Sequence, residues 1–213
     1  MTAADHRLRF RYSPTSPFVR KVLVVAHELQ VLDRLDLVRA DPWSPDTDIA
    51  PDNPLGKVPA LSTPDGLVVG STLICAYLET LADGRSLLPA DPAARWAVLR
   101  AHAVAEGILD AAVAATMERM RRPQDKIWQG WLDRQAGKVR TALDFLAALP
   151  AESRAQVDLY TLTLACVLAY LDLRMPDFDW RARHPDLATF EAEFARRPSL
   201  LATRPEELSR SAA

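Results

Sequence analysis

The residue types that are scarce in this sequence exclude several classes of protein. The 213-residue chain contains two cysteines, seven glycines and four histidines. Two cysteines cannot build the disulfide framework of a small secreted domain. Cys75 and Cys166 both lie in apolar helical patterns, which predicts buried and unreactive thiols. The histidines are scattered without the spacing of metal ligands, so we expect no metal site.

Long apolar runs and an excess of charge of one sign are also missing. No stretch approaches the roughly 18 apolar residues of a membrane-spanning helix, and the first residues contain no apolar core of a signal peptide. Lys and Arg total 26 against 28 Asp and Glu, so no basic surface for nucleic acid is indicated. Hydrophobic residues make up 49% of the chain, which is typical of a globular protein. We therefore expect a cytoplasmic protein whose partners include neither membrane nor nucleic acid.

Proline, with 16 residues, is abundant and unevenly distributed. Up to residue 82, short apolar runs alternate with turn signals in the order β-α-β-loop-β-β-α. These elements are predicted as strands at 8–12, 35–39, 58–62 and 67–69, and helices at 17–29 and 71–81. After residue 82, only helical patterns follow, at 93–122, 124–149, 158–173 and 186–195. The sequence thus predicts an α/β domain over 1–82, a linker over 83–92 and an all-α domain over 93–213.

Three hydroxyl side chains stand at the junction of the first strand and the first helix. They are Ser13, Thr15 and Ser16 in the segment Tyr12–Lys21, YSPTSPFVRK. The partial positive charge of a helix N-terminus makes a nearby thiol more acidic, and a donated hydrogen bond adds to this. Together they lower a thiol pKa near 8.5 by roughly one to two pH units. A simple helix cap at Ser16 and a turn at Ser13 explain the same residues equally well.

The segment Asn53–Leu61, NPLGKVPAL, places a proline at the start of a predicted strand. This is unusual because proline cannot donate to the strand ladder. A cis peptide bond between Val58 and Pro59 would turn the backbone of Val58 outward, where it could pair with a peptide-like ligand. Lys57 could then meet a carboxylate. The alternative is an edge-strand proline beside a solvated lysine.

The segment Val69–Glu79 begins the second predicted helix, with Ser71 as its expected cap. The unpaired N–H groups of a helix N-terminus form a ready site for a carboxylate. Simple capping is again the alternative.

Taken together, these segments make the sequence similar to the cytosolic glutathione transferases, over nearly the whole chain. Asn53–Leu61 resembles the cis-proline loop of that family. Ser13–Lys21 resembles the active-site segment of its serine-type bacterial members. Thr161–Asp172 resembles the buried helix of its C-terminal domain. The resemblance implies a thioredoxin-like N-terminal domain followed by a helical domain, assembled as a homodimer.

The resemblance also implies the chemistry: attack of a glutathione thiolate on a small hydrophobic electrophile, as in detoxification, without a metal. Ser16 matches the reactive cysteine of omega-type relatives, Ser13 matches better in an alignment with zeta-type relatives, and Thr15 lies between them. Which hydroxyl activates the thiol stays open. The glutathione contacts implied are Phe18, Lys57, Val58, Pro59, Gly70 and Ser71.

One position departs from the family pattern. Gly70 stands where the family has Glu or Asp to pair with the γ-glutamyl amine. The loss corresponds to about 1–3 kcal/mol, or about ten- to a hundredfold in affinity. Glu106 and Asp110 share a helix face with His102 and could supply the missing acid, or form a solvated or interface cluster. Gly70 also favours an alternative function, a glutathione-transferase-like binding or regulatory module with weak or no catalysis. A third hypothesis for the function is a carrier of hydrophobic ligands.

Two further expectations concern the helical half. The resemblance implies an electrophile pocket to which Met117, Met120 and Arg121 would contribute. The family begins its buried helix with a capping box, whose two residue types are exchanged here as Asp158 and Thr161. We expect Asp158 to cap the helix and the short Thr161 not to return the bond.

Overall fold

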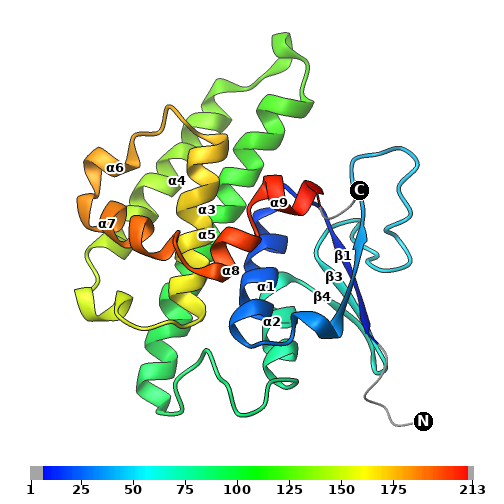
Figure 1. Cartoon of the computed structure of the whole chain (residues 1–213). Helices are drawn as coiled ribbons and strands as arrows, with labels where there is room; N and C mark the ends of the chain where they lie inside the picture. The colour runs from blue at the N-terminus through cyan, green and yellow to red at the C-terminus, as the bar shows by residue number, and fades with distance from the viewer. Residues whose placement is uncertain (1–6, 211–213) are drawn as a thin grey trace. The chain divides into compact units, whose positions relative to one another are not determined.

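The computed structural model describes residues 7–210, which form two compact units (Figure 1). The first unit extends to Leu87 and also includes the C-terminal segment from Pro198, and the second is Leu88–Arg197. The first contains β1 (Leu8–Tyr12), α1 (Pro17–Glu28), η1 (Leu32–Arg34), β2 (Leu35–Arg39), β3 (Ala60–Thr63), β4 (Gly66–Val69), α2 (Ser71–Glu79), α8 (Pro198–Ala202) and α9 (Pro205–Arg210).

The sheet of the first unit has the strand order β2-β1-β3-β4. β1 pairs in parallel with β2 and antiparallel with β3, which in turn pairs antiparallel with β4. All four strands were predicted, and the third begins two residues later than expected, at Ala60. The reason is that Pro59 has no N–H to donate to the ladder.

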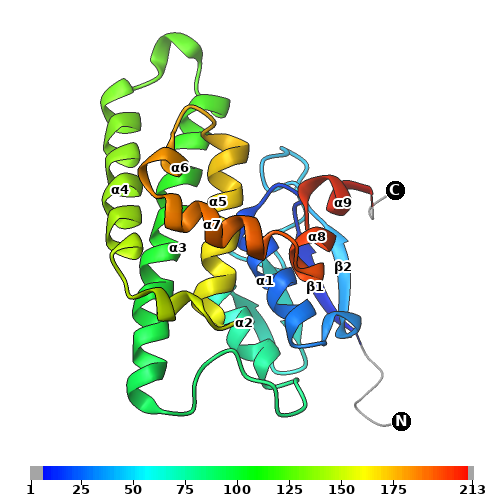
Figure 2. The same cartoon turned by 60° about the vertical axis from the view of Figure 1, so that its left-hand side comes forward.

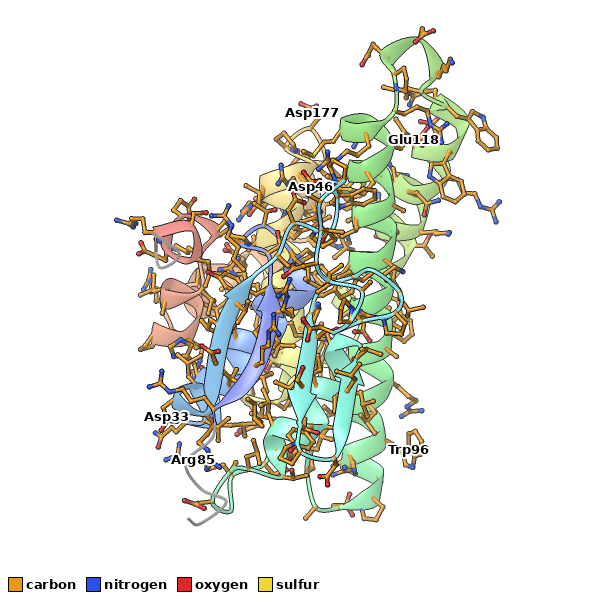
Figure 3. All side chains as sticks on the ribbon, turned by 90° about the vertical axis from the view of Figure 1, so that its right-hand side faces the viewer. Asp33, Asp46, Arg85, Trp96, Glu118 and Asp177 are labelled. Atoms are coloured by element: carbon orange, nitrogen blue, oxygen red, sulfur yellow. The ribbon has the colours of Figure 1, made fainter. Side chains whose placement is uncertain are left out.

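Helices α1 and α2 pack together on one face of the sheet (Figure 2). Figure 3 shows the other face of the sheet in front, with the loop that carries the labelled Asp46 at the end where β1 and β2 finish. The apolar side of α1, including Val19 and Val22, is completely buried with Phe10 of β1 and Leu61 of β3. The sequence of α1 explains this, because its Val and Leu residues recur at helical spacing.

The C-terminal segment packs on α1. Arg20 Nη2 donates to the carbonyl of Leu200 at 3.1 Å, and Ser199 Oγ donates to Glu28. The side chains of Ser199 and Leu200 are buried. The pattern of the sequence predicts these residues as part of the all-α domain, because periodicity identifies a helix but not the neighbour against which it packs.

The second unit consists entirely of helices in the residues that the structure describes. They are α3 (Pro92–Arg121), η2 (Gln124–Lys126), α4 (Gln129–Ala147), η3 (Ala151–Arg154), α5 (Leu159–Arg174), α6 (Trp180–Arg183) and α7 (Pro185–Phe194). α3 packs against both α4 and α5. α5 is buried on nearly all sides, with Cys166 at 0% exposure. Cys75 in α2 is also buried, so both thiols lie where the sequence predicted.

The start of α5 corrects one expectation. Thr161 N donates to Asp158 Oδ1 at 2.8 Å, and Asp158 N donates to Thr161 Oγ1 at 2.9 Å. The exchanged capping box therefore closes in both directions, because the first helical turn brings the third residue beside the cap and even a short hydroxyl reaches it. Burial raises the pKa of the Asp158 carboxyl above its ordinary value, although hydrogen bonds from Thr161 oppose this.

Candidate functional site

The strand register brings the three segments with predicted chemistry to one end of the sheet. Arg11 near the end of β1 pairs with Ala60 at the start of β3, and Ala60 pairs with Val69 at the end of β4. The hydroxyl segment follows β1, the Val58–Pro59 segment precedes β3, and α2 follows β4. Pairing alone thus places the starts of both helices beside the proline loop.

The first segment is built around the N-terminus of α1. Ser16 is the N-cap, and its Oγ accepts a hydrogen bond from Val19 N at 3.3 Å. Ser16 N donates to the carbonyl of Ser13 at 3.1 Å, which closes the turn before the helix. Ser13, Ser16 and Phe18 are half-buried and Thr15 is exposed. A hydroxyl that accepts one bond still has its own O–H to donate, so Ser16 combines a donor with the positive end of a helix.

The second segment contains the expected cis peptide bond between Val58 and Pro59. Asn53, which is buried, fixes this loop: its Nδ2 donates to the carbonyl of Lys57 at 2.7 Å, and its Oδ1 accepts from Leu55 N at 2.9 Å. Val58 is half-buried and the Lys57 side chain is exposed. Asn53 was not among the residues predicted for the site. The signal for it was present, because an Asn before a proline commonly bonds the backbone two residues on.

The third segment differs from the prediction at its cap. Gly70, not Ser71, is the N-cap of α2, and Ser71 is the first helical residue, with a buried side chain. The backbone of Gly70 has φ +90° and ψ 124°, a conformation that favours glycine. A glycine cap brings no oxygen to the first turn, and this turn contains no acidic residue. The N-terminus of α2 is therefore suited to an added carboxylate.

Charged side chains buried near this end of the sheet were not found from the sequence. Arg11, which is 1% exposed, pairs with Asp48, and its Nε lies 3.5 Å from Asp52 Oδ2. This guanidinium holds the pKa of the Asp48 carboxyl below its ordinary value by hydrogen bonding to it. Arg11 thus anchors the loop that leads into Asn53. Apolar and polar residues alternate in β1, which indicates one buried face, but this pattern does not show that a loop covers the other face.

Six other residues that the sequence analysis named belong to α3 in the second unit. The His102 ring is buried, with Nδ1 3.0 Å from Thr163 Oγ1 and Nε2 3.7 Å from Glu106 Oε2. These contacts confirm that His102 and Glu106 share a helix face. The other predicted residues are Asp110 and Arg121, both exposed, Met117, which is half-buried, and Met120, which is 54% exposed.

Within residues 7–210, the structure has no helix that is long and apolar enough to cross a membrane. The same residues include no group of three or more His, Cys, Asp or Glu side chains that could hold a metal ion.

Comparison with known families identifies the class to which this fold and site belong. The glutathione S-transferase N-terminal domain matches residues 15–81, and the glutathione S-transferase C-terminal domain matches residues 129–193. The chain therefore belongs to the glutathione S-transferase family, with a thioredoxin-like N-terminal sheet and a helical C-terminal region.

Individual relatives agree with this assignment. The chain is 32% identical to the uncharacterized GST-like protein YibF of Escherichia coli K12, over 91% of this chain and 96% of that protein. It is 42% identical to a glutathione transferase family member from Pseudomonas fluorescens Pf-5 with bound glutathione (TM-score 0.88, covering 93% of this chain and 98% of that one). Another structure from Pf-5 holds S-(propanoic acid)-glutathione (TM-score 0.84, 42% identity, 92% and 98% coverage).

Proposed function

We propose that this protein is a glutathione transferase that activates the glutathione thiol for attack on a small hydrophobic electrophile. The observation that carries the proposal is the convergence of two helix N-termini and the cis-proline loop at one end of the sheet. The glutathione-bound relative from Pseudomonas fluorescens, at 42% identity, supports glutathione as the ligand.

In this proposal the backbone holds glutathione. Val58 pairs with the cysteinyl unit through its N–H and C=O, in the manner of an added strand. The Lys57 side chain is exposed, and its ammonium group pairs with the glycyl carboxylate. The γ-glutamyl carboxylate binds Ser71 and the N-terminus of α2. Pro59 fixes the loop, and Phe18 covers the cysteinyl unit.

The thiolate lies at the N-terminus of α1, where Ser16 donates its O–H to the sulfur. Ser16 is favoured among the three hydroxyls because it is the cap itself, and the helix field is strongest within the first turn. Ser13 and Thr15 are the other candidates. The sulfur then forms a bond to the electrophilic carbon. In a substitution, the leaving group departs with the electron pair of its bond to that carbon. In an addition, the π electron pair moves to the neighbouring atom, which takes up a proton. The protein contributes a stabilised thiolate held in position.

The family resemblance assigns Met117, Met120 and Arg121 to electrophile binding, and Glu106 or Asp110 to the glutathione amine. S-(propanoic acid)-glutathione, held by the relative from Pf-5, is a thioether of the kind that this reaction forms. The protein acts as a homodimer.

Titration of the bound thiol tests the function. Thiolate absorbance is followed against pH for glutathione with and without excess protein, after calorimetry has given the affinity. We expect binding at millimolar affinity or tighter and a bound-thiol pKa lowered by roughly one to two pH units. A glycine cap at position 70 favours a second function, a binding module without catalysis. Binding with an unchanged thiol pKa would support that module and contradict the transferase.

A further inference from the structure

Lys21 is a lysine of α1 with 0% exposure, and the mechanism above makes no use of it. Lysine is almost never fully buried, because removing an ammonium group from water costs free energy unless polar partners replace the water. Burial of Lys21 therefore requires polar partners, and these partners connect it to the candidate site.

The Lys21 ammonium connects the two helices that begin at the site. Its Nζ donates to Thr72 Oγ1 at 3.1 Å. Thr72 is the second residue of α2 and follows Ser71, whose side chain is also buried. The charge therefore lies next to the first turn of α2, where the proposed function places the γ-glutamyl carboxylate.

Two positive contributions coincide at this point. A helix N-terminus carries about half a positive charge, and the Lys21 ammonium adds a full one. The first turn of α2 contains no acidic residue, and the Gly70 cap brings no carboxylate. A buried charge is screened much less than an exposed one, so its field reaches a ligand atom bound to the same turn.

We propose that Lys21 is the positioning residue for the γ-glutamyl carboxylate. It orients the first turn of α2 through Thr72, and its charge makes the site selective for thiol peptides that carry a carboxylate at this end. The inference rests on the proposed function, because it requires that glutathione binds with this orientation.

The test compares two ligands on two charge states of residue 21. The ligands are glutathione and 4-aminobutanoyl-cysteinylglycine, which is glutathione without the γ-glutamyl carboxylate. Lys21→Met replaces the ammonium with an apolar side chain of similar volume. We expect Lys21→Met to weaken glutathione binding about tenfold and to leave the affinity of the analogue within about twofold. Lys21→Arg retains the charge and should restore most of the affinity for glutathione.

A matched variant separates the hydrogen bond from the charge. Thr72→Val keeps the shape of the first turn and the charge of Lys21 but removes the oxygen that accepts from Nζ. Thr72→Val should weaken glutathione binding by less than Lys21→Met does. It should also weaken the binding of glutathione more than the binding of the analogue. Thermal unfolding of each variant shows that the fold is retained.

Each outcome discriminates. An equal loss for both ligands would assign Lys21 a purely structural role and overturn the inference, while the proposed function stands. A wild-type protein that binds neither ligand would overturn the proposed function and the inference with it. If Lys21→Met does not fold, Thr72→Val decides the matter, and equal affinities of wild type and Thr72→Val for glutathione would overturn the inference.

Discussion

Gly70 permits a quantitative test, because its backbone conformation and its chemistry affect different measurements. Its φ of +90° lies where L-residues are rare, and a Cβ at this position would meet no atom within 4 Å. Any side chain added there is therefore strained by the backbone and not by a clash. Gly70→Glu, Gly70→Gln and Gly70→Ala should each lower the free energy of unfolding by a similar amount, about 1–3 kcal/mol. Urea denaturation measures this.

The effect of Gly70→Glu on glutathione affinity should be smaller than the family comparison suggests. Gly70 is exposed, so a carboxylate there would pair with the glutathione amine in a solvated setting. Exposed ion pairs contribute about 0.2–1 kcal/mol, which corresponds to about 1.5- to 5-fold in affinity. Calorimetry at low salt should show this gain for Gly70→Glu alone. The gain should shrink at high salt as the pair is screened.

Three results would refute this reasoning. Equal affinities of the Glu and Gln variants would show that position 70 does not face the amine. A Gly70→Ala variant as stable as wild type would show that the backbone at this cap relaxes without cost. A gain near a hundredfold would mean that glutathione buries the pair completely.

Three further predictions concern neighbouring contacts. Ser16→Ala should raise the pKa of the bound thiol and lower stability by about 1 kcal/mol through loss of the cap, whereas Ser16→Asp keeps the cap and should raise the thiol pKa alone; an unchanged thiol pKa in both would shift the role to another hydroxyl. Asn53→Ala leaves the Lys57 carbonyl and Leu55 N–H unpaired, so urea denaturation should show a loss of about 1–3 kcal/mol together with weaker glutathione binding; a loss below about 0.5 kcal/mol would show that water replaces both bonds. Because burial raises the pKa of Asp158, the folded state holds that proton more tightly than the unfolded state. Stability from this group is then greatest below its ordinary pKa of about 3.9 and falls as pH rises through the folded pKa. Asp158→Asn should remove this part of the pH dependence, and an unchanged slope would contradict the assignment.

The sequence predicted those parts of the structure that depend on local pattern. Alternation in β1, the Ser-Pro start of α1 and the periodicity of α3 each reflect a rule that acts within one element. The cis bond at Val58 also had a local sign, a proline where a strand should donate an N–H.

The parts that were missed depend on tertiary contacts. The burial of Arg11 requires a loop from further along the chain to cover the sheet. The cap at Gly70 follows from a φ value that the residue type permits but does not announce. The packing of Leu200 on α1 joins residues about 180 positions apart, as the Arg20 contact shows. No periodicity within a helix carries that information.

The attachment of the C-terminal segment to α1 has a consequence for synthesis on the ribosome. The second unit is inserted within the first, because the chain leaves the first unit after Leu87 and returns to it at Pro198. At about 5–20 residues per second, the ribosome needs roughly 6–20 s to make the intervening residues. During that interval the surface of α1 that α8 covers stays open. A nascent chain released before Pro198 therefore contains every element of the candidate site, but the surface of α1 that α8 would cover is exposed. This exposed surface makes the chain a substrate for chaperones and proteases.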